Sequence, residues 1–123
     1  LEANYQTGNI TEIEYVIYHQ WFDWILSNFK HHPAGIVYLN TSADICNQRI
    51  NQRNRTGEEG IPIEYLKMLE KYHLEWLQKE TSIPVQYLFT NDNFFEQPEK
   101  KNAAIQSIMK MVDEIYTNKI RFT

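Results

Sequence analysis

The sequence predicts an α/β fold in which two short parallel strands lie between longer helices. Two runs carry the strand signal, residues 36–39 and 85–89, because both are apolar, rich in β-branched or aromatic residues and too short for helices. The segments around them repeat apolar residues at helical spacing. Strands that alternate with helices imply a parallel sheet with helices packed against it. Two strands make a poor sheet, so we expect further strands outside this chain.

The first predicted helix begins at Thr11 and runs to about Phe29. Thr11 and Glu14 have the spacing of a capping box, and the helix-breaking residues 33–35 follow. Its buried face is expected from the apolar residues at helical spacing, namely Ile13, Ile17, Trp21, Trp24 and Ile25. The aromatic stretch of residues 21–24 could form a ring cage for a ligand, but its helical spacing favours core packing.

The second predicted helix follows the first strand. Thr41, with Asp44 three residues later, supplies its N-terminal capping sequence. The helix carries Arg49 and Arg53, which are four residues apart and therefore project from one face. We expect it to fray over residues 54–57, where the chain enters a glycine-containing turn.

The third predicted helix begins near Pro62, because proline favours the first turn of a helix. We expect His73, on its apolar face, to be a hydrogen-bonded core residue rather than a catalyst. The second strand leads into a polar loop at residues 90–93. The last helix is predicted over residues 103–116 from its apolar stripe of Ile105, Ile108, Met109, Val112 and Ile115.

Arg49, Arg53 and Arg55 place three fixed cations within seven residues of a chain whose net charge is −4. A guanidinium presents a rigid fork of donors that matches phosphate oxygens, so this cluster suits the binding of a polyphosphate. Ligands of parallel sheets gather at the carboxyl ends of the strands, and both the cluster and the 90–93 loop follow such ends. The alternative is a solvated helix face whose arginines pair with the nearby carboxylates Glu58, Glu59 and Glu64.

The acidic residues near these segments also have two interpretations. Glu58 or Glu59 could accept a hydrogen bond from a sugar hydroxyl, or could form an ion pair with Arg53 or Arg55. Asp92 could lie near a base or a ribose, or could be a turn residue, which the sequence Asn-Asp-Asn favours.

Composition argues against several classes of protein. The 123 residues suffice for one domain, and 42% hydrophobic residues can form a core. The acidic charge argues against a chain that mainly binds nucleic acid non-specifically. Cys46 is the single cysteine, which favours a reducing compartment. No zinc-binding motif and no apolar run of about 18 residues occurs, and we expect no metal site at the pair His31–His32.

A longer pattern connects these features. The strand at 36–39 is followed by a Thr-Ser turn, the arginine cluster, an acidic pair, the sequence Ile-Pro-Ile-Glu-Tyr-Leu at 61–66 and His-Leu-Glu-Trp-Leu at 73–77. The whole run from 36 to 77 resembles the deoxynucleoside kinase family, which includes deoxycytidine and deoxyguanosine kinases, mitochondrial-type thymidine kinase and insect and viral relatives. Residues 15–24 resemble the helix that precedes the matching strand in that family.

This resemblance implies a role for each residue that matches. Arg53 and Arg55 match lid arginines that close over the transferring phosphoryl group, in a lid of about residues 49–61. Arg49 matches an arginine near the phosphates and adenine of ATP, and Glu58 matches the glutamate that accepts the sugar 3′-hydroxyl. The loop that wraps the adenine corresponds to Asn91, Asp92, Asn93 and Phe94. Glu59 stands where the family varies, so no role carries over to it.

The resemblance further implies a P-loop kinase-like fold and ATP-dependent phosphorylation of deoxynucleosides at the 5′-hydroxyl, with Mg²⁺ accompanying ATP. In the family the P-loop, the catalytic base and the base-reading residues precede the matching segment, and this sequence has no GxxxxGK[ST] motif. We therefore expect residues 1–123 to be the C-terminal part of one kinase domain, without metal ligands of its own and inactive alone.

The expected partners are a deoxynucleoside, ATP and a second copy of the chain, since members of the family are usually dimers; nucleic acid and membranes are not expected. The expected location is the cytoplasm, with the mitochondrion as the other option. The rival interpretation is an inactive kinase remnant that serves as a dimerising or regulatory helical module. A nucleic-acid binder that uses residues 49–55 is disfavoured by the acidic total.

Overall fold

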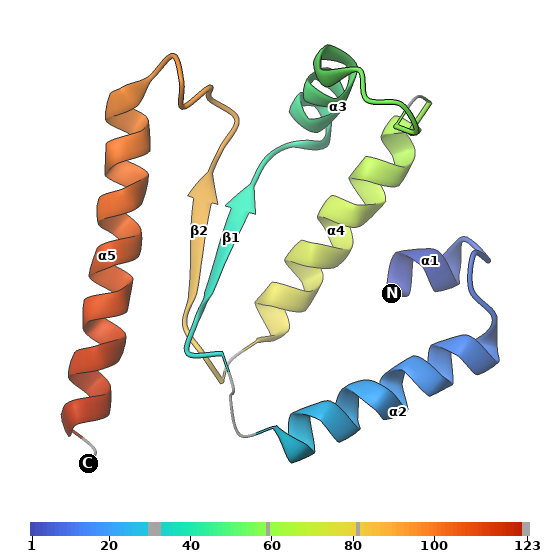
Figure 1. Ribbon diagram of the computed structural model, residues 1–123, viewed down its shortest axis with the longest axis horizontal. Coiled ribbons are helices and arrows are strands. Elements are labelled where there is room, and N and C mark those ends of the chain that lie inside the picture. Colours follow the sequence, from blue (N-terminus) through green and yellow to red (C-terminus); the bar gives the residue numbers. More distant parts are fainter. Residues whose placement is uncertain (30–32, 59, 81, 122–123) are drawn as a thin grey trace.

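The computed structural model describes residues 1–29, 33–58, 60–80 and 82–121. Along the chain a pair of helices precedes each strand and a single helix follows the second strand (Figure 1). They are α1 (Glu2–Gln6), α2 (Glu12–Asn28), β1 (Ile36–Asn40), α3 (Ala43–Arg53), α4 (Ile63–Lys79), β2 (Val85–Phe89) and α5 (Pro98–Arg121). The predicted α/β order is confirmed, with one helix more than the sequence indicated.

The two strands form a parallel sheet, as the alternation of strands and helices predicts. Ile36 lies opposite Val85, and the register continues to Asn40 opposite Phe89. The crossover between the strands consists of α3 and α4, which pack against each other. Helix α5 runs beside β2, so both carboxyl ends of the strands open toward α3 and the start of α5 (Figure 1).

Few residues of the described chain are buried. The buried apolar residues are Ala3, Ala43, Leu77, Leu88 and Met111, and the buried polar residue is Thr90. They come from five different elements and one loop, and Ala3 lies in α1, which packs on α4, so the core is a thin seam between neighbouring elements. Close packing at this seam is visible at Gly35, where an added Cβ would lie 2.6 Å from Cε of Met111.

The predicted buried face of the first helix is wrong. Ile13 is 71% exposed and Trp21 60% exposed, and no residue of α2 is buried. Helix α2 is held at its start, where the ring of Tyr15 stacks on that of Tyr5 at 4.3 Å and its hydroxyl donates to Glu2. Helical periodicity shows that one face is apolar, but it does not show what covers that face, and nothing in the described chain covers this one. The aromatic stretch at 21–24 is therefore not core either.

His73 also departs from its prediction. Its Nδ1 lies 2.7 Å from the carbonyl oxygen of Leu69, so it is hydrogen bonded, but the residue is exposed. Its ring stacks on Tyr38 of β1 at a centroid distance of 5.9 Å, which joins α4 to one face of the sheet. Burial raises the pKa of the Tyr38 hydroxyl.

The ends of two helices differ from the sequence prediction, and one short helix was not predicted. The capping box of Thr11 and Glu14 is present, but α3 begins after Ser42 and receives no capping bond from Thr41. The short helix α1 was not predicted; it packs on α4, where the hydroxyl of Tyr65 donates to Asn4. Helix α5 extends the predicted 103–116 at both ends.

The pair His31–His32 and Glu59 lie outside the described residues. Among the helices that the structure describes, none has both the length and the apolar character needed to cross a bilayer.

Candidate functional site at the carboxyl ends of the strands

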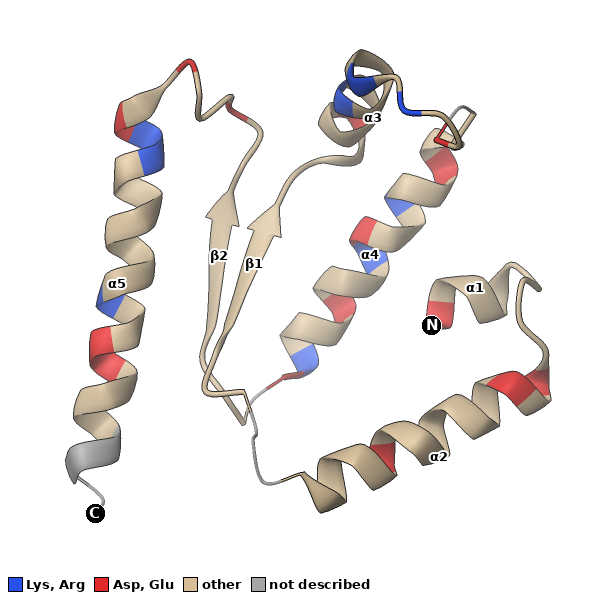
Figure 2. Cartoon of the chain, in the orientation of Figure 1, with Lys and Arg blue, Asp and Glu red and all other residues tan. Residues whose placement is uncertain are grey.

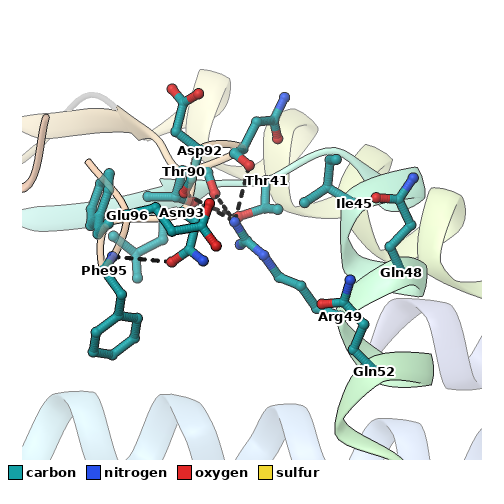
Figure 3. Close-up of a pocket in the computed structure, with 13 residues that line it drawn as sticks. Thr41, Ile45, Gln48, Arg49, Gln52, Thr90, Asp92, Asn93, Phe95 and Glu96 are labelled. Carbon is teal, nitrogen blue, oxygen red and sulfur yellow. Dashed lines mark hydrogen bonds between the residues drawn. The ribbon is translucent and has the colours of Figure 1, made fainter.

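The carboxyl ends of β1 and β2 are joined by hydrogen bonds just beyond the sheet. The N–H of Thr90 donates to the carbonyl of Asn40 at 3.0 Å, and the hydroxyls of Thr41 and Thr90 share a hydrogen bond. An open cavity of about 670 Å³ lies over this junction (Figure 3). Its lining comes from the end of β1, one face of α3 and the loop after β2: Leu39, Thr41, Ile45, Gln48, Arg49, Gln52, Thr90, Asn91, Asp92, Asn93, Phe94, Phe95 and Glu96.

Arg49 reaches from α3 across this cavity to the loop after β2. Its Nη2 lies 2.7 Å from the carbonyl oxygen of Thr90 and 3.1 Å from those of Asn91 and Asp92 (Figure 3). These acceptors are neutral, and within the described residues no carboxylate pairs with Arg49. The guanidinium therefore keeps its positive charge inside a cavity that has room for a ligand.

The start of α3 is held by groups from elsewhere in the chain. The N–H of Ser42 donates to Oδ1 of Asn91 at 2.9 Å, and the N–H of Ala43 donates to Oε2 of Glu70 at 3.2 Å. Two of the N–H groups that a helix leaves unpaired at its start are thus satisfied from α4 and from the loop after β2. The hydroxyl of Thr41, which the sequence suggested as the cap, bonds to Thr90 instead.

Arg53 and Glu58 form an ion pair at the other end of α3. Nη2 of Arg53 lies 2.6 Å and Nε lies 3.1 Å from the same carboxylate oxygen, Oε2 of Glu58. The chain turns back between them because Asn54 and Gly57 adopt positive φ angles of 47° and 91°. The pairing alternative is thus observed for Arg53.

Arg55 lies in this turn, exposed to solvent. Its main-chain carbonyl accepts from the N–H of Glu58 at 3.1 Å, and its side chain has no ion-pair partner among the described acids. Arg55 and Glu58 line a smaller cavity of about 180 Å³, together with Ile50, Asn51, Asn54 and Gly60. Figure 2 shows the basic residues of α3 and of the turn after it at the same end of the molecule as the strand ends.

The loop after β2 is ordered by its own side chains and by α5. Nζ of Lys100 lies 2.6 Å from Oδ2 of Asp92, and this hydrogen bond is the main reason why the pKa of Asp92 is lowered. Oδ1 of Asn93 accepts from the N–H of Phe95 at 3.0 Å. Phe94 is half-buried in the cavity wall, whereas Phe95 is 94% exposed.

The structure thus gathers Arg49 with Asn91, Asp92, Asn93 and Phe94 around one cavity, and Arg55 with Glu58 around another. Arg53 lines neither cavity. Sequence reasoning missed Gln48, Gln52, Glu70 and Lys100. Gln48 and Gln52 share the helical face of Arg49, so their spacing could have indicated them, whereas Glu70 and Lys100 carry no such signal.

These features define the class of the protein: an α/β segment with a cation-bearing cavity at the carboxyl ends of parallel strands. The family model of deoxynucleoside kinases matches residues 1–113, and the chain belongs to this family.

Several curated relatives are similar over most of the chain. Mitochondrial thymidine kinase 2 of Macaca fascicularis is 42% identical over 85 residues, which are 69% of this chain and 32% of the relative. Deoxycytidine kinase 2 of Gallus gallus is 35% identical over 115 residues, 85% of this chain and 43% of the relative. Deoxycytidine kinase of Mus musculus is 35% identical over 106 residues, which are 77% of this chain and 41% of the relative. The chain therefore spans less than half the length of these relatives.

Metal binding has no candidate in the described residues, where no three His, Cys, Asp or Glu side chains group closely enough to hold an ion.

Proposed function

We propose that this chain is the C-terminal part of a kinase that transfers the γ-phosphoryl group of ATP to the 5′-hydroxyl of a deoxynucleoside. The observation that carries the proposal is the cavity of about 670 Å³ at the strand ends, which Arg49 and residues 90–96 line in a chain of this family. A cavity of this size is typical of small-molecule sites, and its position is the usual one for ligands of parallel sheets.

The proposed reaction divides the residues between the two substrates. The adenine of ATP would lie against the loop of Asn91, Asp92, Asn93 and Phe94, near the uncompensated charge of Arg49. Glu58 would accept a hydrogen bond from the sugar 3′-hydroxyl and so place the 5′-oxygen in line with the γ-phosphorus.

In the chemical step the 5′-oxygen bonds to the γ-phosphorus while the bond to the β–γ bridging oxygen breaks, and ADP leaves. Arg53 and Arg55 would stabilise the charge on the moving phosphoryl group, since such reactions depend on charge stabilisation more than on covalent help. The base that takes the 5′ proton is proposed to lie in the part of the kinase outside this chain. Mg²⁺ would neutralise phosphate charge there, since the described residues offer it no ligand cluster.

Arg53 is the residue that tests this proposal most directly. In the complete protein, meaning the product of the full reading frame that encodes this chain, Arg53→Ala should lower kcat more than it raises KM for either substrate. Lys71→Ala is the matched control, because Lys71 is an exposed cation paired with Glu75 on α4, away from both cavities. Unchanged kcat in Arg53→Ala would contradict the role.

The rival function makes the opposite prediction. An inactive remnant would bind no ATP and would phosphorylate none of the four deoxynucleosides, yet it could still form dimers. We propose instead an active homodimeric kinase in the cytoplasm, with the mitochondrion as the alternative, and no activity of residues 1–123 alone. Assays of the complete protein and of the 123-residue chain with labelled ATP, together with their masses in solution, decide between the two.

A further inference from the structure

The loop after β2 and helix α3 hold each other by reciprocal hydrogen bonds. A loop side chain binds the helix backbone, since Oδ1 of Asn91 accepts from the N–H of Ser42. A helix side chain binds the loop backbone, since Arg49 donates to the carbonyls of Thr90, Asn91 and Asp92. Asn91 therefore takes part in both contacts: its side-chain Oδ1 accepts from Ser42, and its main-chain carbonyl oxygen accepts from Arg49.

The helix has no local substitute for this contact. Ser42 is its N-cap residue but makes no side-chain capping bond, and the hydroxyl of Thr41 is bonded to Thr90. The other external group, Glu70, reaches the next N–H, that of Ala43. Without Asn91 the N–H of Ser42 would depend on water, and the start of α3 would lose one of its two attachments.

The position of Arg53 depends on this attachment because Arg53 lies at the far end of the same helix, two residues before Arg55 in the turn that follows. Helix α3 has 11 residues, so it is about 16 Å long, and Arg53 is its last residue. A small rotation about the start of the helix is therefore enlarged at Arg53. Catalytic groups lose much of their effect when they are displaced by about 1 Å.

We infer that Asn91 is a positioning residue for Arg53, and that its side chain holds the lid helix rather than the nucleotide. This inference rests on the proposed kinase function and changes the role that the family resemblance assigns to the side chain of Asn91. Because the same loop lines the larger cavity, a ligand that orders residues 90–93 also fixes α3.

Two substitutions at Asn91 separate positioning from direct nucleotide contact. Asn91→Leu keeps the size of the side chain and removes the acceptor, whereas Asn91→Asp keeps an acceptor at a helix N-terminus, where a negative charge is favourable. In the complete protein, Asn91→Leu should lower kcat about fivefold or more, the fold-change expected for loss of one capping bond. KM for ATP should change less than twofold, and Asn91→Asp should restore kcat.

Hydrogen exchange provides a readout that needs no kinase activity. Exchange at the amides of Ser42 and the first turn of α3 should be about fivefold faster in Asn91→Leu and near normal in Asn91→Asp. Asn93→Leu is the matched control for this measurement, because within the described residues Oδ1 of Asn93 bonds only to the N–H of Phe95 in the loop. It should leave the exchange of α3 unchanged.

The outcomes are distinguishable. A rise in KM for ATP with unchanged kcat would mean direct nucleotide contact and would overturn the inference. Equal defects in Asn91→Leu and Asn91→Asp, or unchanged exchange of α3 in Asn91→Leu, would overturn it as well. If the wild-type protein has no kinase activity, the proposed function fails, while the exchange comparison still decides whether Asn91 holds the helix.

Discussion

The ion pair of Arg53 and Glu58 predicts that Glu58 restrains the affinity of the lid for the phosphate donor. Nε and Nη2 of Arg53 both donate to Oε2 of Glu58. The side chain of Arg53 is 49% exposed and that of Glu58 is 27% exposed. Solvent screens a pair of this kind, so it contributes about 0.2–1 kcal/mol. Glu58→Gln keeps the shape of the side chain and removes its charge, so that Arg53 no longer has to leave a carboxylate to meet a phosphate.

The upper value of about 1 kcal/mol corresponds to roughly a fivefold change in an equilibrium constant. We therefore expect Glu58→Gln in the complete protein to bind ATP about two- to fivefold more tightly in the absence of nucleoside, measured by titration calorimetry. The gain should shrink when salt is added, because salt screens exposed charges. Glu64→Gln is the matched control, since it removes the same charge from a residue that pairs with Lys67.

The double variant Arg53→Ala/Glu58→Gln isolates the pair from the general effect of charge. If the pair is the cause, Glu58→Gln makes no difference to ATP affinity once Arg53 is absent. The reasoning is refuted by a gain that persists in the Arg53→Ala background, or by an equal gain in Glu64→Gln.

Three further predictions concern the core and the loop after β2. Leu77→Ala should lower the free energy of unfolding by about 2–4 kcal/mol in denaturant titrations, because Leu77 is 2% exposed; a loss below about 0.5 kcal/mol would show that the seam is not packed as described. Gly35→Ala should cost no more than about 1 kcal/mol in the same assay, because the atom nearest the new Cβ is Cε at the flexible end of Met111, which can move aside; a loss above about 2 kcal/mol would show that Met111 cannot yield. Lys100→Gln should raise the pKa of Asp92 in an NMR titration, and an unchanged pKa would show that Lys100 is not the cause of the lowered value. Because the pKa of Asp92 is lowered in the folded protein, this carboxylate stabilises the fold above its ordinary pKa of 3.8. That stabilisation is lost as the pH falls through the pKa of the folded state.

The sequence predicted the elements that local rules determine. Periodicity and strand composition located β1, β2 and four of the helices, and the capping box of Thr11 and Glu14 formed where its spacing indicated. Capping of α3 was mispredicted because Thr41 had a second possible partner, the hydroxyl of Thr90, which lies 49 residues away in the sequence. Local rules cannot weigh a partner that only the parallel pairing of the strands brings close.

The exposed face of α2 shows the same limit in another form. A helix with Ile13, Ile17 and Trp21 at helical spacing has an apolar stripe, and its burial depends on which other element reaches it. In the described chain none does, so the stripe stays in solvent. The candidate site was easier to locate, because the carboxyl ends of parallel strands follow from strand order alone. Its hydrogen-bond partners, such as Asn91 with Ser42, required coordinates.

The charge pattern of the sequence does not rank the three arginines, but the structure gives each a different availability to an incoming anion. Arg55 is exposed and has no acidic partner among the described residues, so its recruitment costs least. Arg53 must first leave Glu58, at a cost limited to about 1 kcal/mol by solvent screening. Arg49 is held by three carbonyls, one of them on the buried Thr90, and is therefore the most fixed. A phosphate donor would thus meet a fixed cation beside the loop and, in the proposed lid, two cations that are easier to recruit, so the side chains of Arg53 and Arg55 would move toward it while Arg49 stays in place.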